Sequence, residues 1–388
     1  MKKSLLALAV AAFAATSASA AQVYDKDGTT LGIGGEVETM YWSNHASGMD
    51  SEDQTVSDRV RFSLDGRTQL TNNIAGYGFY EWEVEHKGDS SEAQDVNARY
   101  AYLGVDFDKF GKVQVGRYED PFEYAGNVVD NLEEAGLLCG MDERNSGHLS
   151  YMWSGYGFDA GVSYQFAEDN YNADMLGNVD VDSGFSVYAG YTTPTVGFGP
   201  ISIRAAYLYL KAQDPKHESA DGNIHYEDEN DGKDKLFENF ALDNIKSSDF
   251  GLSWGNMGDG WYVGTHYNYT KASGHQSDDT NQDGFVKFKT WESMVSYGFD
   301  NGVVLSAAYS YVTQKATVDG EYNPQELKSL KSKYAQVVAS YDVNENFRVW
   351  GEAIFDCGSD DGFNIYDFYK GDKDEAANAF LVGARYTF

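Results

Sequence analysis

The chain has 388 residues, with 61 acidic against 29 basic side chains and a formal net charge of −32. Aromatic residues make up 15% of the sequence, and only two cysteines are present. These figures exclude a disordered acidic tail, a disulfide-rich scaffold and a cysteine-rich zinc fold, and the negative charge argues against nucleic-acid binding.

The first twenty residues have the pattern of an export signal. Two lysines precede an apolar run at 5–15, and residues 18–20 read Ala-Ser-Ala, as in a cleavage site. We therefore expect residues 1–20 to be a signal peptide that Sec export removes, and residues 21–388 to form one domain. Beyond residue 20, no apolar run approaches the roughly 20 residues that a transmembrane helix needs.

The rest of the chain alternates with period two. In one example, Val303, Leu305 and Tyr309 are apolar, whereas Ser306 and Ser310 between them are small and polar. Such alternation over eight or more residues predicts long strands with one apolar and one wet face. The segments that show it are 31–43, 57–70, 74–86, 97–107, 112–119, 147–153, 158–168, 183–193, 201–213, 247–255, 261–271, 287–298, 303–314, 332–342, 347–357 and 378–388.

The connections between these sixteen segments alternate in length. Short ones such as 71–73 and 300–302 alternate with long polar ones, which are 44–56, 120–146, 214–246, 273–286, 315–331 and 358–377. A β-sandwich would have strands of only about 5–6 residues. The sequence therefore predicts an all-β fold, a sixteen-stranded transmembrane antiparallel β-barrel with its short turns on the periplasmic side.

Several stretches, in this order, resemble the general (non-specific) porins of Gram-negative outer membranes over essentially the whole mature chain. They are the Gly-Tyr-Gly segment that opens 76–83, the segments 99–104 and 111–117, the Arg-Asn-Ser at 144–146 and the terminal Phe388. The resemblance implies a homotrimer in the cell outer membrane, beside lipopolysaccharide and lipid. Each subunit would have one water-filled pore for small hydrophilic solutes and ions, and a third loop folded inward. It implies no cofactor and no enzymatic activity.

The same resemblance implies a charged constriction. The third loop, 120–146, carries acids at the family's acidic positions, Asp130 and Glu134, and Glu133 stands where Pro is common. Arg61, Arg99 and Arg144 match the family's arginine cluster on the opposite wall. The alternation within strand 57–70 agrees, because Arg61 lies on the face opposite the apolar side chains. A charge facing lipid at mid-depth costs roughly 2–4 kcal/mol, so the face with Arg61 must be the lumen.

The acidic residues of the wall depart from that pattern. Glu36 stands where the family often has a basic residue, and Glu38, Glu81 and Glu83 share the predicted lumen face of their strands. We expect these carboxylates to line the pore and to favour cations. The alternative is that most acids lie in the outer loops and leave the constriction balanced.

Two weaker patterns remain open. Asp279, Asn281 and Asp283 resemble the start of a calcium loop, but position 290 is Thr where the full pattern needs Glu, so we expect no metal site. Cys139 in the third loop and Cys357 at the end of a strand would form a disulfide or remain two free thiols.

Three alternative functions would each need further features of the sequence. A substrate-specific channel, for example a sugar-selective one, would need an aromatic track; Trp42, Tyr188, Tyr262 and Trp350 have lumen parity but are dispersed. An outer-membrane hydrolase would need a catalytic set around His148 and Ser150, for which the sequence offers no acid partner. A structural barrel would have a plugged lumen.

Overall fold

A computed structural model describes residues 21–43, 55–86, 96–130, 132–133, 144–173, 176–213, 224–227, 234–237, 240–276, 279–319, 324–326, 329–359 and 378–388. The expected signal peptide lies outside these ranges. No helix within them is long and apolar enough to cross a membrane.

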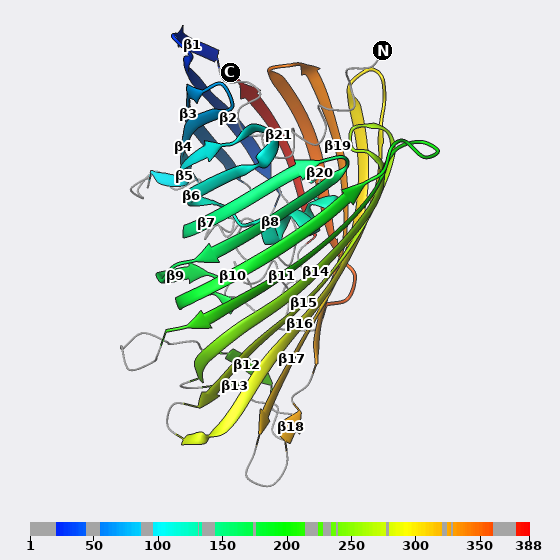
Figure 1. Cartoon of the computed structure of the whole chain (residues 1–388). Coiled ribbons are helices and arrows are strands. Elements are labelled where there is room, and N and C mark those ends of the chain that lie inside the picture. Colours follow the sequence, from blue (N-terminus) through cyan, green and yellow to red (C-terminus); the bar gives the residue numbers. More distant parts are fainter. Residues whose placement is uncertain are drawn as a thin grey trace.

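The described chain forms a closed antiparallel β-barrel of sixteen long strands (Figure 1). The strands of the wall are β2 (Thr29–Trp42), β3 (Thr55–Thr71), β4 (Ile74–His86), β5 (Asn97–Asp106), β6 (Lys112–Glu119), β7 (Arg144–Gly155), β8 (Phe158–Gln165), β10 (Asn178–Thr192), β11 (Ile201–Ala212), β14 (Phe240–Asn256), β15 (Asp259–Gln276), β16 (Asp279–Gly298), β17 (Val303–Asp319), β19 (Leu330–Asn344), β20 (Phe347–Asp356) and β21 (Ala379–Thr387). Each pairs with the next, and β21 pairs with β2 to close the ring.

Several shorter elements accompany the sixteen wall strands. The strands β1 (Ala21–Lys26), β9 (Glu168–Asn172) and β18 (Pro324–Glu326) pair with β2, β10 and β17 respectively. A separate two-stranded sheet joins β12 (Ile224–Glu227) and β13 (Asp234–Phe237). Two 3₁₀ helices are described, η1 (Asp108–Phe110) and η2 (Pro121–Val128).

All sixteen predicted strands are present, and one predicted connection is wrong. Strand β15 continues to Gln276 and β16 begins at Asp279, so 273–286 is not a long loop. The candidate calcium loop is therefore part of a strand. The side chains of Asp279 and Asn281 lie outside the described part, and Asp283 pairs with His275 in the β15–β16 ladder.

The barrel is apolar outside and mostly polar inside at mid-height. The outward side chains of Val60, Val263 and Val337 are 42–45% exposed, whereas Glu38 and Ser247 point inward and are buried. Such an outer surface suits hydrocarbon, and closure leaves no unpaired strand edge in it. We call the end with the short turns the turn end, and the other the loop end.

Candidate functional site: the inward loop and its charged wall

The third loop turns inward directly after β6. Asp120 caps η2, because its Oδ1 accepts a hydrogen bond from the backbone N–H of Phe122 at 2.8 Å, and Pro121 follows at the first helical position. Ser163 on β8 also donates to the Asp120 carboxylate. Pro121, Phe122 and Ala125 are buried against the wall, so η2 lies inside the barrel.

Glycines in the wall allow η2 to approach the strands closely. A Cβ added at Gly251 on β14 would lie 2.1 Å from the carbonyl oxygen of Ala125, and one at Gly264 on β15 would lie 2.0 Å from that of Val128. Any larger side chain would displace the loop, since backbone atoms stand in the way. The two glycines are therefore part of what positions the inward loop.

Polar side chains of the wall then satisfy the carbonyl groups of η2. Arg204 on β11 donates to the Tyr124 carbonyl at 3.0 Å, and the Tyr262 hydroxyl donates to the Val128 carbonyl at 2.6 Å. A 3₁₀ helix buried inside a barrel needs such partners, because its last carbonyls have none of their own.

Beyond η2, Glu133 reaches the wall on the far side of the loop. Its carboxylate lies 2.8 Å from Arg348 Nη1 on β20 and 3.1 Å from Arg385 Nη1 on β21. The Arg348 guanidinium also pairs with Asp342 at 2.6 Å. One loop carboxylate thus bridges two wall arginines.

A continuous ion-pair ladder covers the adjacent wall. Cross-strand register places Glu36, Arg61 and Glu83 side by side on β2, β3 and β4. Arg61 lies 2.7 Å from Glu36 and 2.6 Å from Glu83, and Arg99 on β5 lies 2.9 Å from both Glu81 and Glu83. Alternating charges in direct cross-strand contact stabilise the sheet, unlike like charges.

The ladder continues across the closure of the barrel. Glu38 is fully buried between Arg59 on β3 and Arg385 on β21, whose Nε donates to it at 2.5 Å. Because Arg385 also contacts Glu133, the ladder joins the inward loop to the wall. We use the name ion-pair ladder for Glu36, Glu38, Arg59, Arg61, Glu81, Glu83, Arg99, Glu133, Arg348 and Arg385.

The predicted constriction residues separate into three groups. Glu133 contacts arginines as expected, but these are Arg348 and Arg385. Arg61 and Arg99, which were expected to face the loop acids, pair with wall glutamates instead. Arg144 lies elsewhere, 3.8 Å from Glu119 and over the Tyr100 ring.

Three further site residues were expected from the sequence. Asp130 is exposed at the start of the loop tip. Glu134 and Cys139 lie outside the described residues, so the pairing of Cys139 with the exposed Cys357 stays a prediction.

The alternation along the strands indicates the lumen face of the three arginines that the sequence analysis did not name. Arg59 shares the face of Arg61, and Arg348 stands among the polar residues of its strand. Arg385 lies opposite in parity to the outward Val382 and Tyr386. What sequence could not supply was the register between β2 and β21, which brings Arg385 to Glu38.

The inner wall toward the loop end is apolar, which the alternation did not predict. Two clusters of inward side chains are almost fully buried there. One includes Met40, Phe288, Val312, Ile354 and Leu381, and the other Leu208, Leu210, Ile245 and Ala272. Leu132 of the third loop packs against the first cluster, and Leu176, between β9 and β10, packs against both. Inward-folded chain, and not water, thus covers this part of the wall.

The four lumen aromatics are also packed side chains. Tyr262 holds η2, the Tyr188 ring lies 5.7 Å from that of Tyr124, and Trp42 and Trp350 belong to the first apolar cluster.

The His148 and Ser150 pair is buried as well. His148 lies 3.3 Å from Asp120, an acid that the sequence did not indicate as its neighbour, and Ser150 bonds to the Tyr118 hydroxyl.

Among the described residues, no group of three or more His, Cys, Asp and Glu side chains is arranged to hold a metal ion.

The fold and the inward loop define a transmembrane β-barrel whose lumen is narrowed from within. A family model described as Gram-negative porin matches residues 7–231, which is more than half of the chain. The chain therefore belongs to the Gram-negative porin family, whose members are channels and not enzymes, and it is an outer-membrane protein.

Individual relatives agree with this assignment. The chain is 28% identical over 405 aligned positions to the outer membrane porin protein OmpD of Salmonella typhimurium, with all of both chains covered. It is 27% identical to outer membrane porin C of the same species, covering 90% of this chain and 91% of the relative.

Solved structures share the fold. The OmpF of Salmonella typhi in complex with daunomycin superposes with a TM-score of 0.65 at 20% identity, covering 95% of this chain and all of the other. The trimer form of OmpT from Vibrio cholerae gives 0.60 at 16% identity, covering 93% of this chain and all of the other.

Proposed function

We propose that this porin is a passive diffusion channel for small hydrophilic solutes and ions. The observation that carries the proposal is Glu133, which a loop inside the barrel brings against Arg348 and Arg385 at 2.8 and 3.1 Å. Fixed charges of both signs beside a narrowed wet passage orient water and polar solutes. An apolar solute would have to displace that oriented water. The filter therefore works by size and polarity.

We further propose a moderate preference for cations. The ladder glutamates, together with Asp342, present six carboxylates to five guanidiniums, so this part of the wall is close to neutral. Selectivity would then follow the acidic charge of the whole chain, −32 in the full sequence. The four buried lumen aromatics offer no exposed track, which favours a diffusion channel over a sugar-selective one.

A planar bilayer measurement tests both statements. Refolded mature protein is inserted under a KCl gradient, and conductance and reversal potential are recorded. We expect large ohmic steps, often in threes, and a potential whose sign shows cation selectivity. A correctly folded protein that does not conduct would contradict the channel, whereas an anion-selective potential would contradict only the cation preference.

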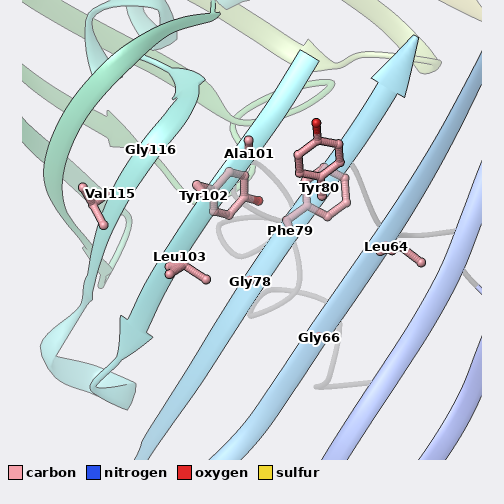
Figure 2. A pocket seen from close by; sticks show the side chains of 10 residues that line it. All are labelled: Leu64, Gly66, Gly78, Phe79, Tyr80, Ala101, Tyr102, Leu103, Val115 and Gly116. Atoms are coloured by element: carbon pink, nitrogen blue, oxygen red, sulfur yellow. The ribbon is translucent and has the colours of Figure 1, made fainter. Parts of the chain in front are cut away.

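We also propose that three copies assemble through the outer face of β3 to β6. An apolar depression lies there, lined by Leu64, Gly66, Gly78, Tyr80, Leu103 and Val115 (Figure 2). Leu103 is 68% exposed, and the two glycines leave room for side chains of a neighbour. A trimer form of a structurally similar porin supports a threefold assembly.

A larger side chain on this face tests whether the face contacts another subunit or lipid. Leu103→Trp should shift the protein from trimer toward monomer on native gels, because a packed interface does not admit the extra ring, whereas fluid lipid does. The matched control is Val263→Trp on the outer face of β15, which is expected to remain trimeric. Trimers of unchanged stability in both variants would place the interface elsewhere.

Residues 1–20 are proposed as the export signal, and lipopolysaccharide as the lipid partner at the extracellular side.

A further inference from the structure

A buried histidine lies between two carboxylates on the inner wall, outside the ion-pair ladder. The Nε2 atom of His266 on β15 is 2.8 Å from Asp249 Oδ2 on β14, and its Nδ1 atom is 3.3 Å from Glu292 Oε2 on β16. His266, Asp249 and Glu292 are only 1%, 6% and 4% exposed. We name these three residues the histidine trio.

The hydrogen-bond chemistry of the trio calls for an additional proton. A neutral imidazole has one N–H donor and one acceptor nitrogen, and an ionised carboxylate only accepts. With a neutral ring, one nitrogen would therefore present its lone pair to a carboxylate oxygen. A proton on that nitrogen turns both contacts into donor–acceptor pairs and reduces the buried charge from two negative charges to one. Because the three groups interact directly, this proton belongs to the trio as a whole.

Neighbouring side chains of the wall leave the two carboxylates dependent on the imidazole. Ser310 donates to Glu292 Oε1 at 2.8 Å, and Asn268 Nδ2 lies 3.4 Å from Asp249 Oδ2. The Asp249 Oδ1 atom is buried without a hydrogen-bond partner. In the part of the chain that the structure describes, the inward positions of β14 to β17 carry no lysine or arginine. On these strands, the positive charge that faces both acids comes from His266.

Other charged or titratable side chains lie on the elements around the trio. They are Arg204 on β11, Tyr262 on β15, Tyr334 on β19, and Glu123, Tyr124 and Asp130 of the inward loop. Arg204 and Tyr262 donate to carbonyl groups of η2. The described part of the loop thus brings further acids and no cation to this side of the barrel, which makes a second negative charge on the trio more costly.

The trio lies where η2 meets the wall. His266 is directly opposite Gly251 in the β14–β15 register and is the next inward residue after Gly264. Both glycines face carbonyl groups of η2. Met294, the inward residue of β16 beside the trio, packs in one apolar cluster with Val128 at the end of η2. The end of η2 and the trio therefore share one small area of the wall.

We propose that the histidine trio binds one proton that keeps the end of η2 against the wall, and that loss of this proton in alkaline solution releases it. The proton passes to a base in solution and leaves two buried carboxylates beside a neutral imidazole. Buried charge without a partner is costly, so hydration of the trio is then favoured. Water reaches the trio when η2 moves, because the three residues are almost fully buried. A change in the width of the passage rests on the proposed channel function, whereas the proton site does not.

Two variants should fix the trio in its two states. Glu292→Gln satisfies both ring nitrogens without an additional proton, since the amide donates to the nitrogen that accepts, so η2 should stay in place at alkaline pH. His266→Gln cannot take up the proton, so η2 should already be released at neutral pH. The control is His275→Gln, which removes a histidine 3.0 Å from Asp243 near the loop end of β15, away from η2.

Hydrogen–deuterium exchange of the backbone amides of residues 121–129 measures the release. Refolded mature wild type and the three variants are compared with one another at pH 7 and again at pH 10, by mass spectrometry. The sequence of η2 is the same in all four proteins, so differences at one pH report on how it is held.

At pH 7 we expect η2 of His266→Gln to exchange at least tenfold faster than that of wild type, and the other two variants to be within twofold of wild type. At pH 10, wild type and His275→Gln should exchange at least tenfold faster than Glu292→Gln. A purely structural role of Glu292 predicts the opposite, because its replacement would then loosen η2 at both pH values.

Equal exchange of wild type and Glu292→Gln at pH 10 would overturn the proposal, as would fast exchange of Glu292→Gln at pH 7. This comparison decides the question even if His266→Gln does not fold. Conductance is not part of the readout. A folded barrel that does not conduct would therefore contradict the channel proposal and leave the exchange result valid.

Discussion

Single carboxylates in this barrel hold several arginines at once. Glu83 contacts Arg61 and Arg99, and Glu133 contacts Arg348 and Arg385. Hydrogen bonds between charged partners are among the stronger ones, but each depends on its partner remaining charged. Removing one acid therefore leaves two guanidiniums with one carboxylate partner fewer each, which changes both the local field and the stability of the wall.

Glu133→Gln should move the reversal potential toward anions. The amide keeps the size of the side chain but leaves the positive charges of Arg348 and Arg385 less compensated beside the passage. The control is Glu345→Gln, which removes the same charge at the exposed turn between β19 and β20. A shift as large in the control as in Glu133→Gln would show that only total charge matters.

At the scale of elements, the position of η2 is set by the wall beneath it. Consecutive wall strands contribute an arginine, two glycines and a tyrosine, which face the backbone carbonyl groups of Tyr124, Ala125 and Val128. The loop tip then packs through Leu132 and pairs through Glu133. The described part of the loop is therefore attached to the wall at several points.

Gly264→Ala should disturb this arrangement. Its methyl group would lie 2.0 Å from the Val128 carbonyl oxygen, so η2 must move. Overpacking of this kind costs about 1–3 kcal/mol, which urea unfolding of refolded protein measures. We also expect greater noise in the open-channel current.

Gly351→Ala on β20 is the control for that change. The atom nearest its added methyl group would be the Leu381 carbonyl oxygen, at 3.8 Å, which is ordinary contact. If both variants unfold alike and conduct with equal noise, the glycine contact does not hold the loop.

At the scale of the whole molecule, most of the negative charge lies outside the ion-pair ladder. Acidic residues exceed basic ones by 32, whereas the ladder together with Asp342 has six carboxylates and five guanidiniums. Selectivity would then arise from acids outside the ladder, which act through water. Interactions of that kind are screened by salt, with a Debye length of about 10 Å at 0.1 M and about 3 Å at 1 M.

Cation preference should therefore weaken as salt rises. We expect a tenfold KCl gradient between 0.01 and 0.1 M to give a larger reversal potential than one between 0.3 and 3 M, at the same protein orientation. An unchanged potential would locate the selecting charges in the narrowest part of the lumen, within a few ångströms of the ions.

The alternation of side chains was sufficient to predict the strands and the faces of most of them. Period two is a local property, since neighbouring residues of a strand point to opposite sides whatever the rest of the chain does. For this reason the alternation by itself places Arg61 inside and Val60 outside.

Contacts between distant residues were decided by the tertiary structure alone. Arg385 bonds to Glu38 across 347 positions, and Arg348 to Glu133 across 215, because the ring closes and the loop folds inward. The same folding buries Leu208 and Phe288 on a face that alternation assigns to water. Alternation fixes which way a side chain points, whereas what it meets depends on chain that arrives from elsewhere in the sequence.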